Sequence, residues 1–179
     1  MKDDTTGMEI DLGRVEDRET FSFQRSFIIP TLEGGTAECR VAVRADVTKL
    51  GERYDVAARV TGEMFLECHR CLGRFPMPVD VSFDLVLQRG ERAEPPAGVE
   101  SDDFVVIPMT GGDAFDLFPR VREAMILEIP IKVLCREDCK GLCAKCGANL
   151  NEEACGCPEE PLDERWGPLK KSLNGNDKS

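Results

Sequence analysis

The strongest constraint on the fold of this chain is a run of closely spaced cysteines near the C-terminus. Six of the nine cysteines lie in residues 135–157, with the spacing C-x3-C-x3-C-x2-C-x8-C-x-C. Within this run, GLCAKCG places Cys143 and Cys146 two residues apart with Gly147 directly after them. A glycine there allows the tight turn that lets both sulfurs reach one ion. We therefore expect a small structural zinc module in this segment.

Zinc in a structural site takes four ligands in a tetrahedron, so one C-x2-C pair needs a second pair. The favoured ligands are the last four cysteines of the run, Cys143, Cys146, Cys155 and Cys157. The upstream pair, Cys135 and Cys139, is the alternative for completing the site, and a site shared with Cys68 and Cys71 is a further possibility. A catalytic zinc needs an open position, usually with His or carboxylate ligands, so we expect one structural zinc ion.

An earlier C-x2-C pair, Cys68 and Cys71 in LECHRCLGRF, follows an expected strand. Such a pair is either half of a zinc site or a redox dithiol, but a thioredoxin-like motif opens a helix, and here both flanks have a β pattern. Arg70 lies between the cysteines, and Arg74 follows four residues on. Held in a tight turn, these two guanidinium groups could face a phosphate or carboxylate. We therefore expect Cys68, Arg70, Cys71 and Arg74 to form a partner-binding element.

Apolar residues alternate with polar ones over 39–47, 54–68 and 79–87, which is typical of half-buried strands. Residues 21–29 are Phe-rich, and 104–108 read as a brief strand. The fold class expected is α+β: an antiparallel β meander or partly open barrel, with one or two helices and a small C-terminal zinc-binding cysteine module.

A helix is expected over 116–128, capped by Asp116 and with Pro119 in its first turn. A second short helix is expected over 162–173, where apolar residues recur at helical spacing. The polar stretch 89–103 is expected to be a loop. The chain thus divides into a lead-in segment (1–20), a β-rich core domain (21–130), a cysteine-rich module (131–173) and a tail (174–179).

Charge and composition limit the location and the partners. No apolar run of signal-peptide or membrane-spanning length is present, so a reducing cytoplasm is expected, where nine cysteines favour metal or thiol chemistry over disulfides. The net charge of −11 opposes non-specific attraction to nucleic acid. A local basic patch could still contact RNA, and an acidic protein could also act through a basic protein partner.

Three segments together resemble the YceD family, also called domain-of-unknown-function family 177, the large ribosomal RNA subunit accumulation proteins. They are ECHRCLGRF at 67–75, DLFPRVREAMILEIPIKVLC at 116–135, and EDCKGLCAKCGANLNEEACGC at 137–157 followed by LDERWGPLKKSL at 162–173. The resemblance implies a bacterial cytoplasmic protein that is not an enzyme and is needed for normal accumulation of large-subunit ribosomal RNA. It also implies that Cys68, Arg70 and Cys71 form the element shared across the family, and that the C-terminal cysteines vary.

Two functions from different classes therefore compete. The first is a ribosome-biogenesis factor that binds precursor ribosomal RNA or the assembling large subunit, directly or through a basic protein partner, with no membrane and no small-molecule substrate. The second is a cytoplasmic thiol-redox or zinc-handling protein that uses its CxxC pairs. The second function requires exposed, exchangeable cysteines, whereas a structural site holds its metal.

Overall fold

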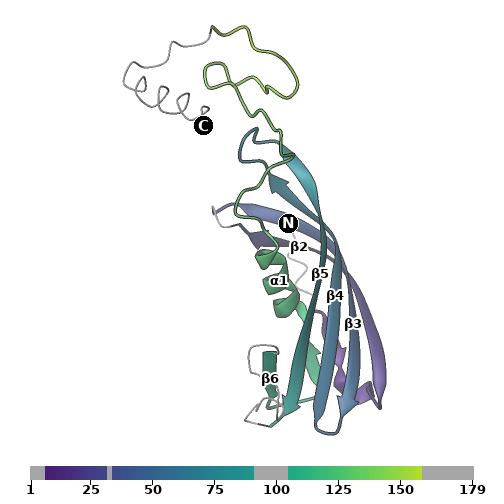
Figure 1. Ribbon diagram of the computed structural model, residues 1–179. Coiled ribbons are helices and arrows are strands. Elements are labelled where there is room, and N and C mark those ends of the chain that lie inside the picture. Colours follow the sequence, from purple (N-terminus) through teal and green to yellow (C-terminus); the bar gives the residue numbers. More distant parts are fainter. Residues whose placement is uncertain (1–6, 32–33, 91–104, 159–179) are drawn as a thin grey trace, which may run out of the picture.

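A long, twisted and open sheet dominates the computed structural model, which describes residues 7–31, 34–90 and 105–158 (Figure 1). Its strand order is β2-β3-β4-β5-β6, and β2 to β5 are consecutive antiparallel neighbours. The last strand, β6, pairs with β5 in parallel. The strands are β2 (Arg18–Pro30), β3 (Thr36–Leu50), β4 (Arg53–Glu67), β5 (Arg74–Arg89) and β6 (Val105–Met109).

One face of this sheet carries the core, as the period-two pattern predicts. Alternate residues of β3 and β4 are buried, and they are Ala37, Cys39, Val41, Val43, Ala45 and Val47 with Tyr54, Val56, Ala58, Val60, Met64 and Leu66. The pattern keeps its phase through Gly62, whose φ is +153°. A β-carbon there would overlap the carbonyl oxygen of Arg40 and lie 2.8 Å from the Cα atom of Val41. Glycine is therefore required at this position of β4, beside Arg40 and Val41 of β3.

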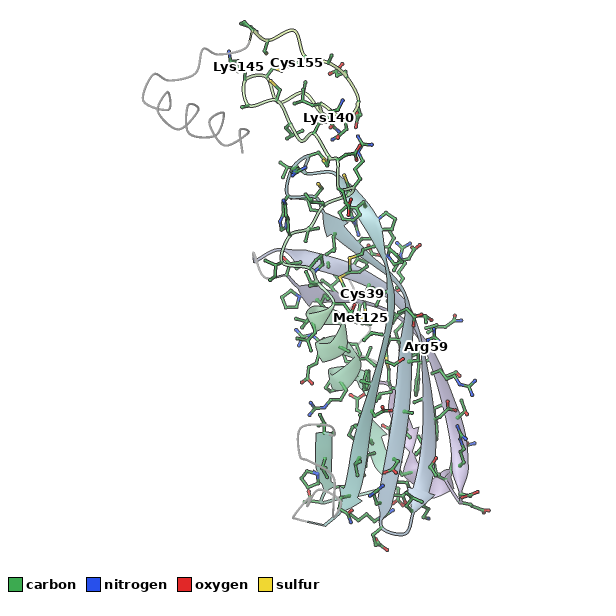
Figure 2. The ribbon with its side chains drawn as sticks, in the orientation of Figure 1. Cys39, Arg59, Met125, Lys140, Lys145 and Cys155 are labelled. Carbon is green, nitrogen blue, oxygen red and sulfur yellow. The ribbon has the colours of Figure 1, made fainter. Side chains whose placement is uncertain are left out.

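The core face is covered by helix α1 (Phe118–Leu127) and by a small second sheet of β1 (Glu9–Asp11) and β7 (Ala114–Asp116). Met125 of the helix points toward the sheet near Cys39 (Figure 2). Phe118 packs edge-to-face on Phe27 of β2, with ring centroids 5.1 Å apart. The expected fold class, an open and largely antiparallel sheet with a helix, is confirmed. The parallel β5–β6 pair makes the sheet mixed.

The expected lead-in segment is largely part of the fold. Met8, Ile10, Leu12 and Val15 are buried in the core, and β1 and the 3-10 turn η1 (Leu12–Arg14) lie under the sheet. Met8, Ile10 and Leu12 alternate with Glu9 and Asp11, but this period-two pattern covers only five residues of a charged segment. They are buried because β1 pairs with β7, a strand more than a hundred residues away.

The helix begins slightly later than expected. Leu117 occupies the capping position, but the carboxylate of Asp116 accepts the backbone N–H of Phe118 at 3.0 Å and that of Met8 at 2.9 Å. Asp116 therefore fixes the first turn and also ties it to the N-terminal segment. The predicted helix over 162–173, the tail and nearly all of the predicted loop over 89–103 lie outside the described residues. No helix in the described part of the chain has the length and apolarity needed to cross a membrane.

Candidate metal centres

Two groups of four cysteines lie beyond the end of the sheet. The first, called cluster 1, joins the turn after β4 to the segment that follows the helix, and it consists of Cys68, Cys71, Cys135 and Cys139. Its sulfurs lie within 4.8 Å of one another, and two sulfur–sulfur distances, Cys68 to Cys139 and Cys71 to Cys135, are 3.8 Å. A tetrahedron with metal–sulfur bonds of ~2.3 Å has edges of about 3.8 Å. The spacing therefore fits one tetrahedral ion.

The second group, called cluster 2, is built from the last four cysteines, Cys143, Cys146, Cys155 and Cys157. Its sulfurs also lie within 4.8 Å of one another. Its members are close in sequence and more exposed than those of cluster 1, with Cys146 on the surface. Lys140, Lys145 and Cys155 mark this module in Figure 2, beyond the sheet end.

Each cluster contains a C-x2-C turn, and the two turns have the same backbone geometry. In the first, the N–H of Leu72 donates to the carbonyl oxygen of Cys68 at 2.9 Å, and in the second the N–H of Gly147 donates to that of Cys143 at 2.9 Å. The residue after the second cysteine is left-handed in both, with φ of +55° at Leu72 and +74° at Gly147. Leucine is unusual in this conformation. Because the first turn has Leu72 where the second has Gly147, its sequence does not carry the glycine that marks the second turn.

Backbone and side-chain contacts fasten the two clusters to each other. Within cluster 1, Arg70 donates from Nη1 to the carbonyl oxygen of Cys139 at 2.7 Å. Toward cluster 2, the carbonyl of Arg70 accepts the N–H of Leu142, the residue before Cys143, at 3.2 Å. Gly141, at φ +78°, packs so closely that a β-carbon would lie 3.0 Å from the Arg70 oxygen. Asn151, in the loop of cluster 2, donates from Nδ2 to the sulfur of Cys139 at 3.4 Å. Each cluster thus helps to position the other.

The thiol groups of cluster 1 divide into two kinds. Burial opposes ionisation of Cys68, but backbone N–H groups of Cys135, Cys71 and Arg70 outweigh it and lower the pKa of Cys68 to about 6. Burial and the neighbouring cluster sulfurs raise the pKa of Cys135 to about 12. In cluster 2, N–H donors from Cys146 and Lys145 lower the pKa of Cys143 to about 6. A divalent cation bound to the sulfurs would offset the repulsion between neighbouring thiolates, which keeps some thiols of each cluster protonated.

The four cysteines that the sequence favoured as one ligand set lie together in cluster 2, and their ligation of a metal stays a prediction. The upstream pair, Cys135 and Cys139, does not complete that set but joins Cys68 and Cys71 instead. The structure therefore offers two metal-competent groups where one site was expected. The sequence signal for the first was the C-x3-C pair together with the earlier C-x2-C pair. A site shared with Cys68 and Cys71 was one of the alternatives, but a separation of more than sixty residues gave no reason to prefer it.

The two arginines predicted to face a partner are both engaged within the chain. Arg70 points back to the carbonyl oxygens of Cys139 and Glu137, as a brace for cluster 1. Arg74 donates to the carboxylate of Glu38 at 2.6 Å and lies over the ring of Phe65, 5.1 Å from its centroid. Arg70 therefore has a structural role, because its side chain donates to the backbone carbonyls of the segment that carries Cys139.

Comparison with known proteins adds independent information. The sequence model of the family "Large ribosomal RNA subunit accumulation protein YceD" matches residues 56–171. A chloroplastic YCED homolog 1 of Arabidopsis thaliana, named as a large ribosomal RNA subunit accumulation protein, is 46% identical over 30% of this chain and 17% of its own length. An uncharacterized protein of Mycobacterium leprae is 32% identical over 71% of this chain and 56% of its own. YlbN of Bacillus subtilis is 28% identical over 78% and 77%.

The match thus spans between about a sixth and about three quarters of the length of these relatives. No solved structure matches the chain. The chain is an open β-sheet protein with two groups of four cysteines at one end of the sheet. It belongs to the YceD family of large ribosomal RNA subunit accumulation proteins.

Proposed function

We propose that this protein supports the accumulation of large-subunit ribosomal RNA in the cytoplasm, by binding and not by catalysis. The observation that carries the proposal is the family match over residues 56–171, which includes both cysteine clusters. Relatives in Arabidopsis thaliana and Zea mays carry the name of large ribosomal RNA subunit accumulation protein. The partner would be precursor ribosomal RNA or the assembling large subunit, reached directly or through a basic protein.

We further propose that both clusters hold zinc in a structural role. Each offers four cysteine sulfurs, the donor set typical of closed structural zinc sites, in which no position remains for a substrate or water. The ion in cluster 1 would tie residues 135–139 to the turn after β4, two segments that β5, β6, β7 and α1 separate in the chain. The cysteine module would then be a rigid extension of the sheet, which suits a binding protein.

One observation favours the competing zinc-handling function, and it concerns cluster 2 alone. Its sulfurs are less buried than those of cluster 1, and Cys146 is exposed. Exposed thiolates exchange metal faster than buried ones. If cluster 2 gives up zinc to a weak chelator within minutes while cluster 1 retains it, the handling function gains support.

The ribosomal function is tested in a strain that lacks the gene. The ratio of large- to small-subunit ribosomal RNA is expected to fall in that strain and to recover with the wild-type gene. Cys68→Ser with Cys71→Ser should fail to restore the ratio, because cluster 1 loses half its ligands. Immunoblotting shows whether the variant protein is retained. A deletion strain with an unchanged ratio would remove the ribosomal function itself.

A further inference from the structure

The face of the sheet opposite the helix is polar, and its charges are unevenly distributed. Arg59 projects from this outer face (Figure 2). Near the first residues of β4, a hollow of about 240 Å³ is lined by three aspartates, Asp46, Asp55 and Asp84, and by two arginines, Arg18 and Arg53. The outer face therefore has one region in which acidic groups predominate.

The middle of the outer face is different. Two adjoining hollows of about 480 Å³ and 490 Å³ share Gln24, Ala42 and Thr61, so they form one continuous groove across β2, β3 and β4. Ala42 and Thr61 are opposite each other in the strand register and make a low floor. The charged residues that line the groove are all arginines, namely Arg25, Arg40, Arg44 and Arg59. In a chain of net charge −11, the lining of this groove carries only positive charges, although a carboxylate just outside it pairs with each of Arg40, Arg44 and Arg59.

Two of these arginines occupy positions that strand pairing alone would disfavour. Arg44 of β3 and Arg59 of β4 are directly opposite each other, and like charges in such pairs destabilise a sheet. Acidic residues outside the groove lining offset the repulsion: Asp46 binds Arg44, and Asp80 binds Arg59. The sheet thus retains a charge pair that its own stability does not require.

The acidic partners also orient the guanidinium groups. Arg40, Arg44 and Arg59 each present the same edge, Nε and Nη2, to a carboxylate, at distances of 2.6–3.2 Å. Within the described residues, the Nη1 amino group of each makes no hydrogen bond in the structure. Each of the three guanidinium groups is therefore oriented by a carboxylate and keeps an Nη1 donor for a ligand, which is a suitable arrangement for binding phosphate oxygens.

We propose that this groove binds the phosphate backbone of single-stranded RNA, an inference that rests on the proposed ribosomal function and gives it a surface. The arginines supply donors and charge. Ser22, Gln24, Ser26 and Thr61 line the same groove and supply neutral donors and acceptors for sugar hydroxyls and base edges. The groove is open along the sheet, so an extended strand fits it better than a compact ligand. An acidic protein segment is the competing occupant, but the neutral polar lining favours RNA.

The test measures binding of a fluorescently labelled single-stranded RNA of about twenty nucleotides to the purified full chain, over a range of salt concentrations. The test variant is Arg44→Gln with Arg59→Gln. The matched control is Arg18→Gln with Arg53→Gln, which removes two arginines from the acidic hollow of the same face. Both doubles change the net charge equally. The side chains of Arg44 and Arg59 are exposed, where ion pairs contribute little to stability, but the Arg53–Asp55 pair is partly buried. Circular dichroism therefore checks that both variants fold before binding is measured.

The wild-type chain is expected to bind RNA, and the groove double should bind roughly tenfold or more weakly. Its slope of log affinity against log salt should fall by about 1.4, two phosphate contacts at about 0.7 each. The control double should retain the wild-type slope. Equal weakening of the two doubles, or binding of a polyglutamate peptide in place of RNA, would overturn the groove as an RNA site.

The outcome is separable from that of the ribosomal function. If the purified chain fails to bind RNA while its gene restores the ribosomal RNA ratio in the deletion strain, the groove is wrong and the function stands. If the ratio never changes on deletion, the function is wrong, whatever the chain binds in solution. If both hold, the groove double should bind weakly and should also fail to restore the ratio.

Discussion

Asn151, in the loop of cluster 2, donates its side-chain amide to the sulfur of Cys139 in cluster 1, at 3.4 Å. Its side-chain oxygen accepts the N–H of Lys140 at 2.8 Å and a donor of Arg136 at 2.7 Å. Arg136 and Lys140 lie on either side of Cys139 in the chain. Folding of the second cluster's loop therefore places a donor and an acceptor on the first cluster.

Replacing Asn151 with alanine should weaken metal binding at cluster 1 about tenfold, the usual cost of removing a hydrogen bond to a metal ligand. Zinc retained against increasing chelator is counted by native mass spectrometry, and alkylation mapping identifies which cysteines have been released. Glu152→Gln is the control, because Glu152 accepts from Asn149 and touches no sulfur. In a Cys155→Ser background the effect of Asn151→Ala should vanish. An undiminished effect there would show that cluster 2 does not position Asn151.

Removing the metal should loosen the end of the sheet and leave its middle intact. Cluster 1 joins the turn over 68–73 to residues 135–139, and the core of the sheet lies elsewhere. Hydrogen exchange after chelation should therefore accelerate in 68–73 and 131–158. Amides around Val43, Val60 and Val81, in the middle of the sheet, should stay protected. Uniform loss of protection would mean that the two regions form one cooperative unit.

Metal affinity at cluster 1 should rise with pH. The pKa of Cys135 is raised to about 12 by burial and neighbouring sulfurs, and that of Cys71 is also raised, so both thiols are protonated at neutral pH without metal. An entering ion displaces these protons, so log affinity should increase by at least about two per pH unit near neutrality. Below pH 6 the slope should steepen, because the pKa of Cys68 is lowered only to about 6 and its thiolate then protonates as well. Chelator competition at several pH values measures the slope, and a flat profile would contradict thiol ligation.

Two left-handed glycines in the module should differ in their tolerance of alanine. At Gly147 a β-carbon meets nothing within 4 Å, so alanine should cost only the backbone penalty, about 1 kcal/mol. At Gly141 the β-carbon would also press on the Arg70 carbonyl, which must keep its hydrogen bond to Leu142. Gly141→Ala should therefore release the module to limited proteolysis well before Gly147→Ala does. Equal susceptibility of the two variants would argue against the Arg70 contact.

The sequence predicted the sheet well because its signal is local. The alternation of apolar and polar residues in β3, β4 and β5 is imposed by one buried face, and each strand shows it independently. The close spacing of the last four cysteines likewise made cluster 2 visible. Such patterns need no knowledge of the rest of the chain.

What the sequence did not predict depends on contacts between distant segments. Cluster 1 forms because the segment after α1 returns to the turn after β4, and nothing local in either segment indicates that. The pairing of β1 with β7 buried a segment that reads as polar. Arg70 and Arg74 could be recognised as fixed in place, but the direction in which each points depends on Cys139 and Glu38, which come from elsewhere in the chain.

We propose that this chain acts on large-subunit ribosomal RNA by binding. Sedimentation of lysate from growing cells, with the protein detected across the gradient, tests it most directly. We expect the protein in the fractions that contain precursors of the large subunit, and we expect it to leave those fractions when the lysate is treated with ribonuclease. Protein found only at the top of the gradient, in cells whose ribosomal RNA ratio depends on it, would contradict stable binding to the assembling subunit.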